Sequence, residues 1–289
     1  MLPNNSEIAA APVVLEPLRR KPFNRANFVV SVTLLAIAAI TLYALFNLEN
    51  KYIPFGEGLL LMLDNFRLMF LEPHFKHFTF GKAVYSALIT LGLAVLTTIL
   101  GAVIAFGVSL LAARNLSGNR MSGFVRAVVA VIRAVPTILW VLIFAVSSGL
   151  GSVAAVIGMT WHTISYLTKA YSEAFEEIDN GTLEALKASG ASRIQIVFQA
   201  VFPSSLSYLI SWTFLRLEMN FSNALAMGAA AGAGGLGYDL YMAGSLYYDI
   251  REIGALTFFI LFFAIVLEIG STRLKNRLRK GALNNGKQG

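Results

Sequence analysis

The 289-residue sequence contains no cysteine and few charged residues. Without cysteine there is no disulfide framework, no thiolate nucleophile and no zinc-thiolate site. Only 13% of the residues are charged, 56% are hydrophobic, and the mean hydropathy is +0.67. A soluble domain of this size needs more polar surface, so the excess of apolar side chains indicates contact with lipid. No nucleophile–base pair or metal-ligand cluster is evident, so we predict that the chain is not an enzyme and holds no metal or cofactor.

Long apolar runs predict an all-α integral membrane protein with about six transmembrane helices. About 20 apolar residues in a helix cross the hydrocarbon core of a bilayer. The predicted spans are approximately residues 28–46, 83–113, 125–146, 150–167, 204–227 and 253–269. They form a membrane domain over residues 28–272, between a polar tail at 1–27 and a basic tail at 273–289. The role of the mixed segment 47–82, which could contain one interfacial helix, is left open.

The distribution of lysine and arginine predicts the orientation of the chain. Sixteen of the 23 basic residues fall in segments 1–27, 114–126, 168–203 and beyond 272, against five in the segments on the other side. Cytoplasmic loops carry an excess of lysine and arginine, so both termini and segment 168–203 are expected in the cytoplasm. The net charge of +7 is thereby explained by topology, and we predict no nucleic-acid partner.

Segment 168–203 is predicted to contain a short helix between two chain breaks. Thr182 is suited to cap a helix over Leu183–Ser189, with Glu184 near its positive end. Gly190 suits the left-handed residue that ends a helix, and Ser192 can cap the next helix. The short helix could lie on the membrane surface as an ordinary amphipathic helix. It could instead dock on another protein through its small and apolar side chains, which are Leu183, Ala185, Leu186 and Ala188.

The spacing of this segment resembles the conserved cytoplasmic loop of ABC importer permeases. Glu184-Ala185, Gly190 and Pro203 follow the E-A-A---G---I-x-L-P pattern of that family, with Pro203 at the start of the fifth span. In the family this loop forms the coupling helix that docks onto the ATP-binding subunits. Three positions depart from the pattern and change details of packing, namely Leu186 for the second Ala, Ala200 for Ile and Phe202 for Leu.

Further motifs extend the resemblance over roughly residues 80–275. They are Arg133 to Trp140, Gly149 to Gly151, His162, Glu173 to Asp179, Arg216 to Asn220, and Gly232 to Gly237. This series resembles the phosphonate-type permeases, whose members import phosphonate, phosphate, phosphite or related oxyanions. The resemblance does not identify the oxyanion, because the binding protein holds most of the selectivity in such systems.

The resemblance implies a type I ABC importer permease fold in the bacterial cytoplasmic membrane. It also implies a homodimer, two ATP-binding cassette subunits that bind ATP and Mg, and an extracytoplasmic substrate-binding protein. Two alternatives stay open. The chain could belong to an importer of an amino acid or a quaternary amine, or it could be a secondary transporter. A secondary transporter would predict an inverted repeat, and no convincing repeat is present in the sequence.

Polar residues within the fifth predicted span fall on two faces of a helix. Thr213, Arg216, Asn220 and Asn223 share one face, because residues four and seven positions apart lie together. We hypothesise that this face lines the translocation path, where a guanidinium and two amides suit an oxyanion. The alternative is that Arg216 is a structural ion-pair partner. Glu218 lies on the other face and is expected to contact a neighbouring helix and its cation.

Other intramembrane residues are predicted to be structural or to act in gating. Arg133 lies three residues before Pro136, whose ring frees a carbonyl near Ile132 that could accept a hydrogen bond from the arginine. Gly234 and Gly235 belong to the glycine-rich end of the fifth span. His162 lies near the middle of the fourth span, and we expect it to be a hydrogen-bonded residue at a helix interface rather than a ligand.

Overall fold

The computed structural model describes residues 25–47 and 54–285, and all regular elements in these ranges are helices. The chain divides into two units, one up to Leu60 and one from Leu61 onward, and each is described by itself. The first unit contains α1 (Arg25–Asn47) and the beginning of α2 (Phe55–Leu71). α1 is apolar along its length and corresponds to the first predicted span, whereas most of the predicted tail 1–27 lies outside the described residues.

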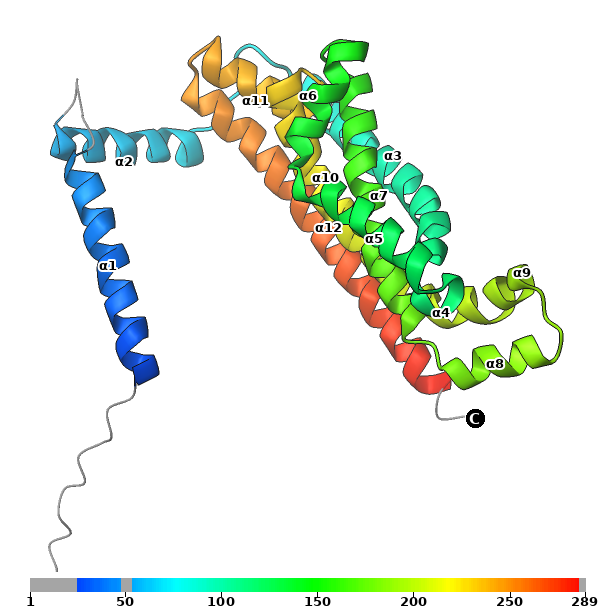
Figure 1. Cartoon of the computed structure of the whole chain (residues 1–289). Helices are drawn as coiled ribbons and strands as arrows, with labels where there is room; N and C mark the ends of the chain where they lie inside the picture. Colours follow the sequence, from blue (N-terminus) through cyan, green and yellow to red (C-terminus); the bar gives the residue numbers. More distant parts are fainter. Residues whose placement is uncertain (1–24, 48–53, 286–289) are drawn as a thin grey trace, which may run out of the picture. The chain divides into compact units, whose positions relative to one another are not determined.

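The second unit is a bundle of helices (Figure 1). Its elements after α2 are α3 (Phe80–Ala112), α4 (Arg114–Ser117), α5 (Asn119–Ala134), α6 (Thr137–Ser148), α7 (Ser152–Glu176), α8 (Asn180–Ala188), α9 (Arg193–Ile196), the π-helical turn η1 (Val197–Val201), α10 (Phe202–Ala231), α11 (Gly235–Ser245) and α12 (Ile250–Asn285).

Helix α3 runs through three clusters of buried apolar side chains. Ala83 near its beginning packs with residues of α11 and α12. Leu93 in the middle belongs to a cluster with α6, α7 and the end of α10. Ala105 near the end packs with α7, α8 and the beginning of α10, where Phe175 and Leu183 are fully or almost fully buried. The length of α3 therefore allows one helix to join all parts of the bundle.

Two glycines permit unusually close backbone approach. A Cβ atom at Gly237 would lie 1.9 Å from the Leu225 carbonyl oxygen, so α11 folds back tightly on α10. A Cβ atom at Gly254 would lie 1.8 Å from the Met69 carbonyl oxygen, where α12 packs on α2. Any other residue at either position would force the two backbones apart.

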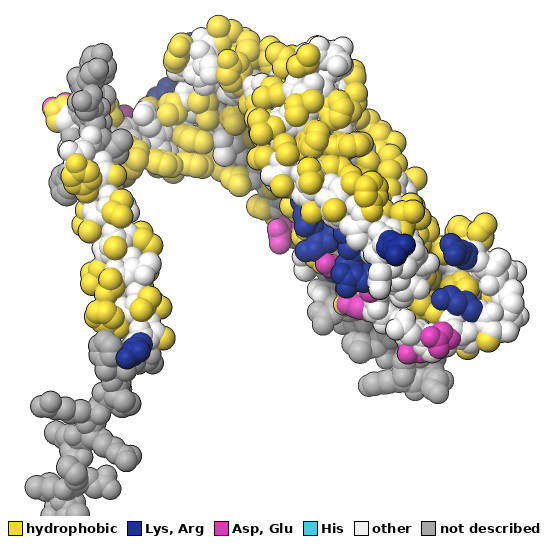
Figure 2. Space-filling view, viewed as in Figure 1, with side chains coloured by type: hydrophobic (Ala, Val, Ile, Leu, Met, Phe, Trp, Pro, Cys, Tyr) yellow, Lys and Arg dark blue, Asp and Glu magenta, His cyan; other side chains and the backbone are white. Residues whose placement is uncertain are grey.

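The apolar helices agree with the predicted membrane architecture. In the described residues four helices are long and apolar enough to cross a membrane: 25–45, 80–112, 193–231 and 250–277. The predicted span 125–146 is interrupted at Pro136, around which α5 and α6 meet at an angle of 89°. This bent pair gives a fifth candidate span. Figure 2 shows hydrophobic side chains over the outer faces of the helices in view.

Helix α7 occupies the fourth predicted span, 150–167, although its composition is too polar for it to be among these candidates. Its polar side chains include Thr163, Ser165 and Thr168, all of which are buried within the chain. α7 packs against α3, α5, α6 and α10. A helix surrounded by protein can carry hydroxyl groups that would be unfavourable against lipid.

Several predicted boundaries differ from the structure. α7 extends to Glu176, so segment 168–203 is not wholly a loop. Pro203 does not begin a new helix, because α9, η1 and α10 follow one another without a break. The π-helical turn precedes the proline, and its wider backbone spacing accommodates the missing N–H of Pro203. The glycine-rich segment leads into α11, which was not predicted, and α12 continues to Asn285 through most of the predicted basic tail.

Candidate functional site

Arg216 on α10 is fully buried between helices of its own chain. Its Nε donates a hydrogen bond to the Thr163 hydroxyl at 3.1 Å. Its Nη2 donates to Nδ1 of His162 at 3.1 Å, which confirms the expectation that His162 is a hydrogen-bonded interface residue. Because arginine only donates, Nδ1 is the acceptor and the ring N–H of His162 is on Nε2.

The guanidinium has neutral partners and one unused donor. Its Cζ lies 5.1 Å from the centroid of the Tyr166 ring, within cation–π range. Nη1 is buried and has no hydrogen-bond partner among the described residues. None of the ion pairs formed within the described part of the chain involves Arg216. The positive charge is therefore not compensated by a carboxylate there, and the alternative of a structural ion-pair partner is not supported.

Asn220, one turn further along α10, connects three helices. Its Nδ2 donates to the hydroxyl groups of Thr98 on α3, at 2.8 Å, and Thr163 on α7, at 3.0 Å. The Thr163 hydroxyl donates in turn to the Met159 carbonyl at 2.7 Å. Thr163 thereby accepts from both Arg216 and Asn220, a role that the sequence analysis missed. The polar residues within an otherwise apolar α7 were the available signal.

The predicted polar face exists, but it lies inside the chain. Thr213 is 2.5 Å from the Tyr171 hydroxyl on α7, and Arg216 and Asn220 have no exposed surface. Asn223 is half-buried. Arg216 and Asn220 are thus covered within a single chain, and the hypothesis that this face lines the translocation path stays a prediction. Helical spacing shows which residues share a face, but the neighbouring α7 decides whether that face is covered.

Glu218 lies on the other face of α10, as predicted. Its carboxylate is 3.9 Å from the Lys275 ammonium group on α12. The pair is partly exposed, with side-chain exposures of 22% for Glu218 and 30% for Lys275. The expectation of a cation on a neighbouring helix is confirmed, and this partly exposed pair is expected to be weak.

The break between α5 and α6 is stabilised differently from the prediction. The Ile132 carbonyl freed by Pro136 accepts a hydrogen bond from the Trp140 indole at 2.9 Å. The expectation that Arg133 uses this carbonyl is therefore wrong. Trp140 also packs edge-to-face against Trp161 of α7, with ring centroids 6.1 Å apart. The Trp140 side chain thus connects the break to α7, which carries His162.

The glycine-rich turn between α10 and α11 packs against α3. Gly234 and Gly235 have φ angles of +82° and +75°, in the region that favours glycine. The Leu236 N–H donates to the Thr90 hydroxyl at 3.0 Å, and a Cβ atom at Gly235 would lie 2.4 Å from that hydroxyl. Gly234 and Gly235 therefore permit a sharp turn close to α3.

The predicted coupling helix is present as α8, at the end of the bundle away from α11 (Figure 1). Its N-cap is Asp179, and not Thr182 as predicted: the Asp179 carboxylate accepts from the Thr182 N–H at 2.9 Å. The hydrogen bond from the Thr182 N–H lowers the pKa of the Asp179 carboxyl group. In Figure 2, acidic and basic side chains gather at the end of the bundle that carries α8.

The side chains of α8 divide into an anchor and an exposed surface. Leu183 is only 1% exposed and packs in the cluster that contains Phe175, so it does not belong to a docking surface as predicted. The exposed side chains include those of Thr182, Glu184, Ala185 and Ala188. Leu186 is half-buried.

The end of α8 has the predicted local structure. Gly190 has a φ of +83°, and the Ala191 N–H donates to the Leu186 carbonyl at 3.1 Å. Ser192 and Gln195 form a reciprocal capping box at the beginning of α9. The left-handed glycine and the capping box together make the sharp corner after α8.

Glu176 joins several helices near α8. Its carboxylate accepts from the Arg114 N–H at 2.8 Å and forms an ion pair with the Arg126 guanidinium at 2.6 Å. Burial opposes ionisation of Glu176, but these contacts outweigh it and lower its pKa below the ordinary value of 4.5. Asn115 reinforces the junction by donating to the Phe175 carbonyl at 2.8 Å.

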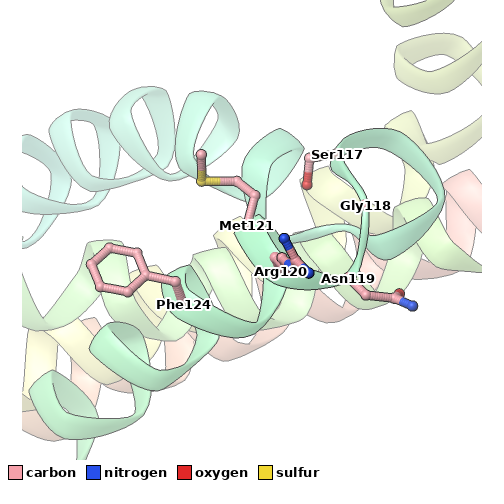
Figure 3. Close-up of a pocket in the computed structure, with 6 residues that line it drawn as sticks. All are labelled: Ser117, Gly118, Asn119, Arg120, Met121 and Phe124. Carbon is pink, nitrogen blue, oxygen red and sulfur yellow. The ribbon is translucent and has the colours of Figure 1, made fainter.

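A surface hollow of about 580 Å³ lies at the turn between α4 and α5 (Figure 3). Its lining side chains come from the single segment 117–124, with Arg120 as the charged member. These residues are neighbours in the sequence, and no distant part of the described chain adds a converging polar group to the lining, so its geometry does not indicate a substrate site.

Comparison with known proteins identifies the family. A family model described as the binding-protein-dependent transport system inner membrane component matches residues 105–281, more than half of the chain. The chain belongs to this family. It is therefore a multi-pass inner-membrane permease subunit. The residues that the family model matches include α8 and Arg216.

Individual relatives and a solved structure agree with this assignment. The permease is 30% identical over 235 residues to HtxC of Stutzerimonas stutzeri, described as a candidate permease of a phosphite transport system; the match covers 81% of this chain and 79% of the relative. It is also 30% identical over 178 residues to the phosphate-import permease PhnE of Mycolicibacterium smegmatis, covering 61% of this chain and 33% of that protein. An inward-facing structure of the MetNI methionine ABC transporter, 24% identical with a TM-score of 0.61, covers 68% of this chain and 96% of that chain.

Proposed function

We propose that this permease forms the membrane pathway of an ATP-driven importer for a small oxyanion such as phosphite, phosphate or a phosphonate. The names of the Stutzerimonas and Mycolicibacterium relatives support this substrate class. The structural observation that carries the proposal is Arg216, a buried cation with a free Nη1 donor and no acidic partner among the described residues. A chain that transports anions can benefit from such a charge, whereas it would oppose the passage of cations.

Arg216 would act on the substrate mainly through its electric field. In this arrangement its side chain is covered by α7, so it does not contact a solute directly. At an effective dielectric constant of about 20, a unit charge about 10 Å away attracts an anion by roughly 1.7 kcal/mol. A gain of this size favours entry of an anion without holding it. Separation of α7 from α10 would additionally expose Nη1.

Coupling to ATP hydrolysis would pass through α8. We place two ATP-binding cassette subunits, which bind ATP and Mg, against its exposed surface of Thr182, Glu184 and Ala185. Leu183 would transmit their movement, because it is buried against the ends of α3, α7 and α10. A substrate-binding protein would deliver the solute on the opposite side, with both termini of the permease in the cytoplasm.

The importer would contain two copies of this chain. A single bundle with four or five candidate spans is a modest enclosure for a polar pathway. Pairing through the same surface on each copy would give a closed twofold assembly, the commonest symmetry of homo-oligomers. The pathway would then run along the interface of the two copies.

Reconstituted transport tests the proposed function. The permease, its ATP-binding subunit and its binding protein would be placed in proteoliposomes, and ATP-dependent uptake of labelled phosphate and phosphite would be measured. Uptake above that of liposomes without ATP, with competition by methylphosphonate, is the expected result. If ATP drives no oxyanion uptake while methionine enters, the oxyanion proposal is wrong.

A methionine or related amino-acid importer is the second candidate. It is favoured by a further relative, the methionine import permease MetP of Bacillus subtilis, which is 28% identical over 167 residues. The MetNI structure, at 24% identity, supports the fold alone. The same proteoliposomes distinguish the two candidates, since methionine is a zwitterion and gains little from one buried positive charge.

A further inference from the structure

A cluster of histidine and carboxylate side chains lies outside the proposed transport machinery. It forms where the segment before α3 meets the turn before α12. One ligand atom each from His77, Asp249 and Glu252 lies within 4.8 Å of the others. His74 adjoins them, with its Nε2 3.9 Å from the Asp249 carboxylate. The two histidines lie more than 170 positions before the two carboxylates in the sequence. For this reason the sequence analysis predicted no metal-ligand cluster.

Glu252 is held so that one carboxylate oxygen remains directed at the cluster. The residue is fully buried. Its Oε1 accepts three backbone N–H hydrogen bonds, from Lys76, His77 and Phe78, at 2.7–2.9 Å. Its Oε2 lies 2.8 Å from Nδ1 of His77. This contact is a hydrogen bond between two candidate ligand atoms, and a metal ion would take the place of the proton that they share. A carboxylate oriented by hydrogen bonds to its other oxygen is a common arrangement for metal ligands.

Asp249 and His77 are oriented in a similar way. Asp249 Oδ1 accepts from the N–H groups of Arg251 and Glu252, at 3.1 and 3.2 Å, while Oδ2 faces His74. The His77 ring stacks on Tyr247, with centroids 4.1 Å apart and planes 10° apart. Asp249 and His77 are therefore each positioned by a contact that does not use the atom facing the cluster.

The charges around the cluster favour a cation. Nearby carboxylates have basic partners: Glu72 pairs with Arg251, and Asp239 lies 3.9 Å from Lys82. In the described ranges, Asp249 and Glu252 form ion pairs only with imidazole groups. A divalent cation would supply the positive charge that no described lysine or arginine gives to these two carboxylates.

We propose that His74, His77, Asp249 and Glu252 bind a divalent transition metal of the zinc type. Two imidazoles and two carboxylates suit zinc better than magnesium or calcium, which prefer oxygen ligands alone. Zinc binds such groups at about 2.0–2.2 Å, so its tetrahedral ligands lie about 3.4 Å apart. The His77–Glu252 separation of 2.8 Å is shorter than this value and the His74–Asp249 separation of 3.9 Å is longer. His74 does not belong to the group of ligand atoms that all lie within 4.8 Å of one another, so its side chain would turn toward the metal as the fourth ligand. The metal would join the beginning of α3 to that of α12, and its binding is independent of the proposed substrate.

Zinc binding to the purified full-length chain tests the proposal. The protein would carry a tag without histidine, be treated with EDTA and be titrated with zinc sulfate, with bound metal measured by calorimetry and atomic absorption. We expect one zinc per chain, and cobalt(II) should give the visible absorption of a tetrahedral complex. The double variant His74→Ala/His77→Ala should bind at least tenfold more weakly, because it removes both nitrogen ligands.

Lys76→Ala is the matched control, since it changes an exposed neighbouring side chain and keeps the backbone hydrogen bond to Glu252. Its zinc affinity should equal that of the wild type. If the double variant does not fold in EDTA, Asp249→Asn gives the same comparison, because its side-chain oxygen can still cap α12. Absence of bound zinc in the wild type, or equal binding by the variants that lack ligands, would overturn the proposal.

Discussion

Arg216 combines full burial with partners that carry no negative charge. Removing a guanidinium from water costs several kcal/mol, and hydrogen bonds to neutral groups recover only part of this cost. The residue therefore contributes little to the stability of the fold compared with a well-packed apolar side chain. Its electrostatic effect on a solute provides a physical reason for a positive charge at this position.

Arg216→Gln is expected to lower oxyanion uptake per assembled complex at least tenfold. Glutamine can still donate to Thr163 but carries no charge, so assembly and basal ATPase activity should remain near wild type. Arg216→Lys should restore part of the uptake because it returns the charge. Uptake would be normalised to complex content in the same vesicles.

Glu218→Gln is the control for that experiment, because it alters a carboxylate on the same helix that faces Lys275. This partly exposed pair is worth about 0–1 kcal/mol, so little change in uptake per complex is expected. Normal transport by Arg216→Gln, or a loss explained entirely by less assembled complex, would make the arginine structural.

Glu176 predicts a specific dependence of stability on pH. Its pKa is lower in the folded protein than the ordinary value of 4.5, because the contacts with Arg114 and Arg126 outweigh the effect of burial. Its stabilising contribution is therefore complete above about pH 4.5 and is lost as the pH falls through the lower folded-state pKa. Thermal unfolding from pH 7 to about pH 3.5 should show the wild type losing its advantage over Glu176→Gln. A difference between the two proteins that does not change with pH would contradict this.

At the scale of elements, some features of α8 could be predicted from neighbouring residues, whereas others depend on contacts with distant helices. The positive φ of Gly190 and the cap at Ser192 depend on residues within a few positions, and both were predictable. The burial of Leu183 depends on α3, α7 and α10, which no local pattern specifies. The same division applies to α10, where the polar face was predictable but its cover by α7 was not.

Gly190→Val should separate folding from coupling. A β-branched residue at φ +83° is strained by roughly 1–2 kcal/mol, although the space around the position is open. The corner after α8 would shift and misplace the exposed surface of the helix. We expect normal membrane insertion with loss of the ATPase stimulation that the binding protein produces.

Gly190→Asn is the matched variant, because asparagine tolerates the left-handed conformation. It should retain most of the stimulated ATPase activity. If the valine variant is also stimulated normally, α8 does not couple the permease to its ATP-binding subunits.

At the scale of the whole molecule, the residues that the family model matches all belong to the second unit. The family model begins at residue 105, within α3, so α1 and α2 lie outside it. The residues of the Arg216 site and of α8 come from α3, α7, α8 and α10 of this unit. The proposed metal cluster instead joins α12 to the segment before α3, at the other end of α3 from α8.

The purified complex is expected to contain two permease chains and two ATP-binding subunits. A closed twofold pair would cover apolar surface of each bundle and enclose the pathway between the copies. Native mass spectrometry of the detergent-solubilised complex would count both subunits. One copy of this chain together with a different permease chain would show that the importer is heterodimeric, and the homodimer proposal would be wrong.

The hydrogen bond from Trp140 to the Ile132 carbonyl makes the α5–α6 break optically observable. The chain contains three tryptophans: Trp140 on α6 packs edge-to-face against Trp161 on α7, and Trp212 lies on α10. Indole emission shifts with the polarity around the ring and with its hydrogen bonding. In a Trp212→Phe background the remaining tryptophan fluorescence would come from this pair, one member of which is hydrogen-bonded across the break. Straightening of the bend during the transport cycle would then change the emission without any added dye.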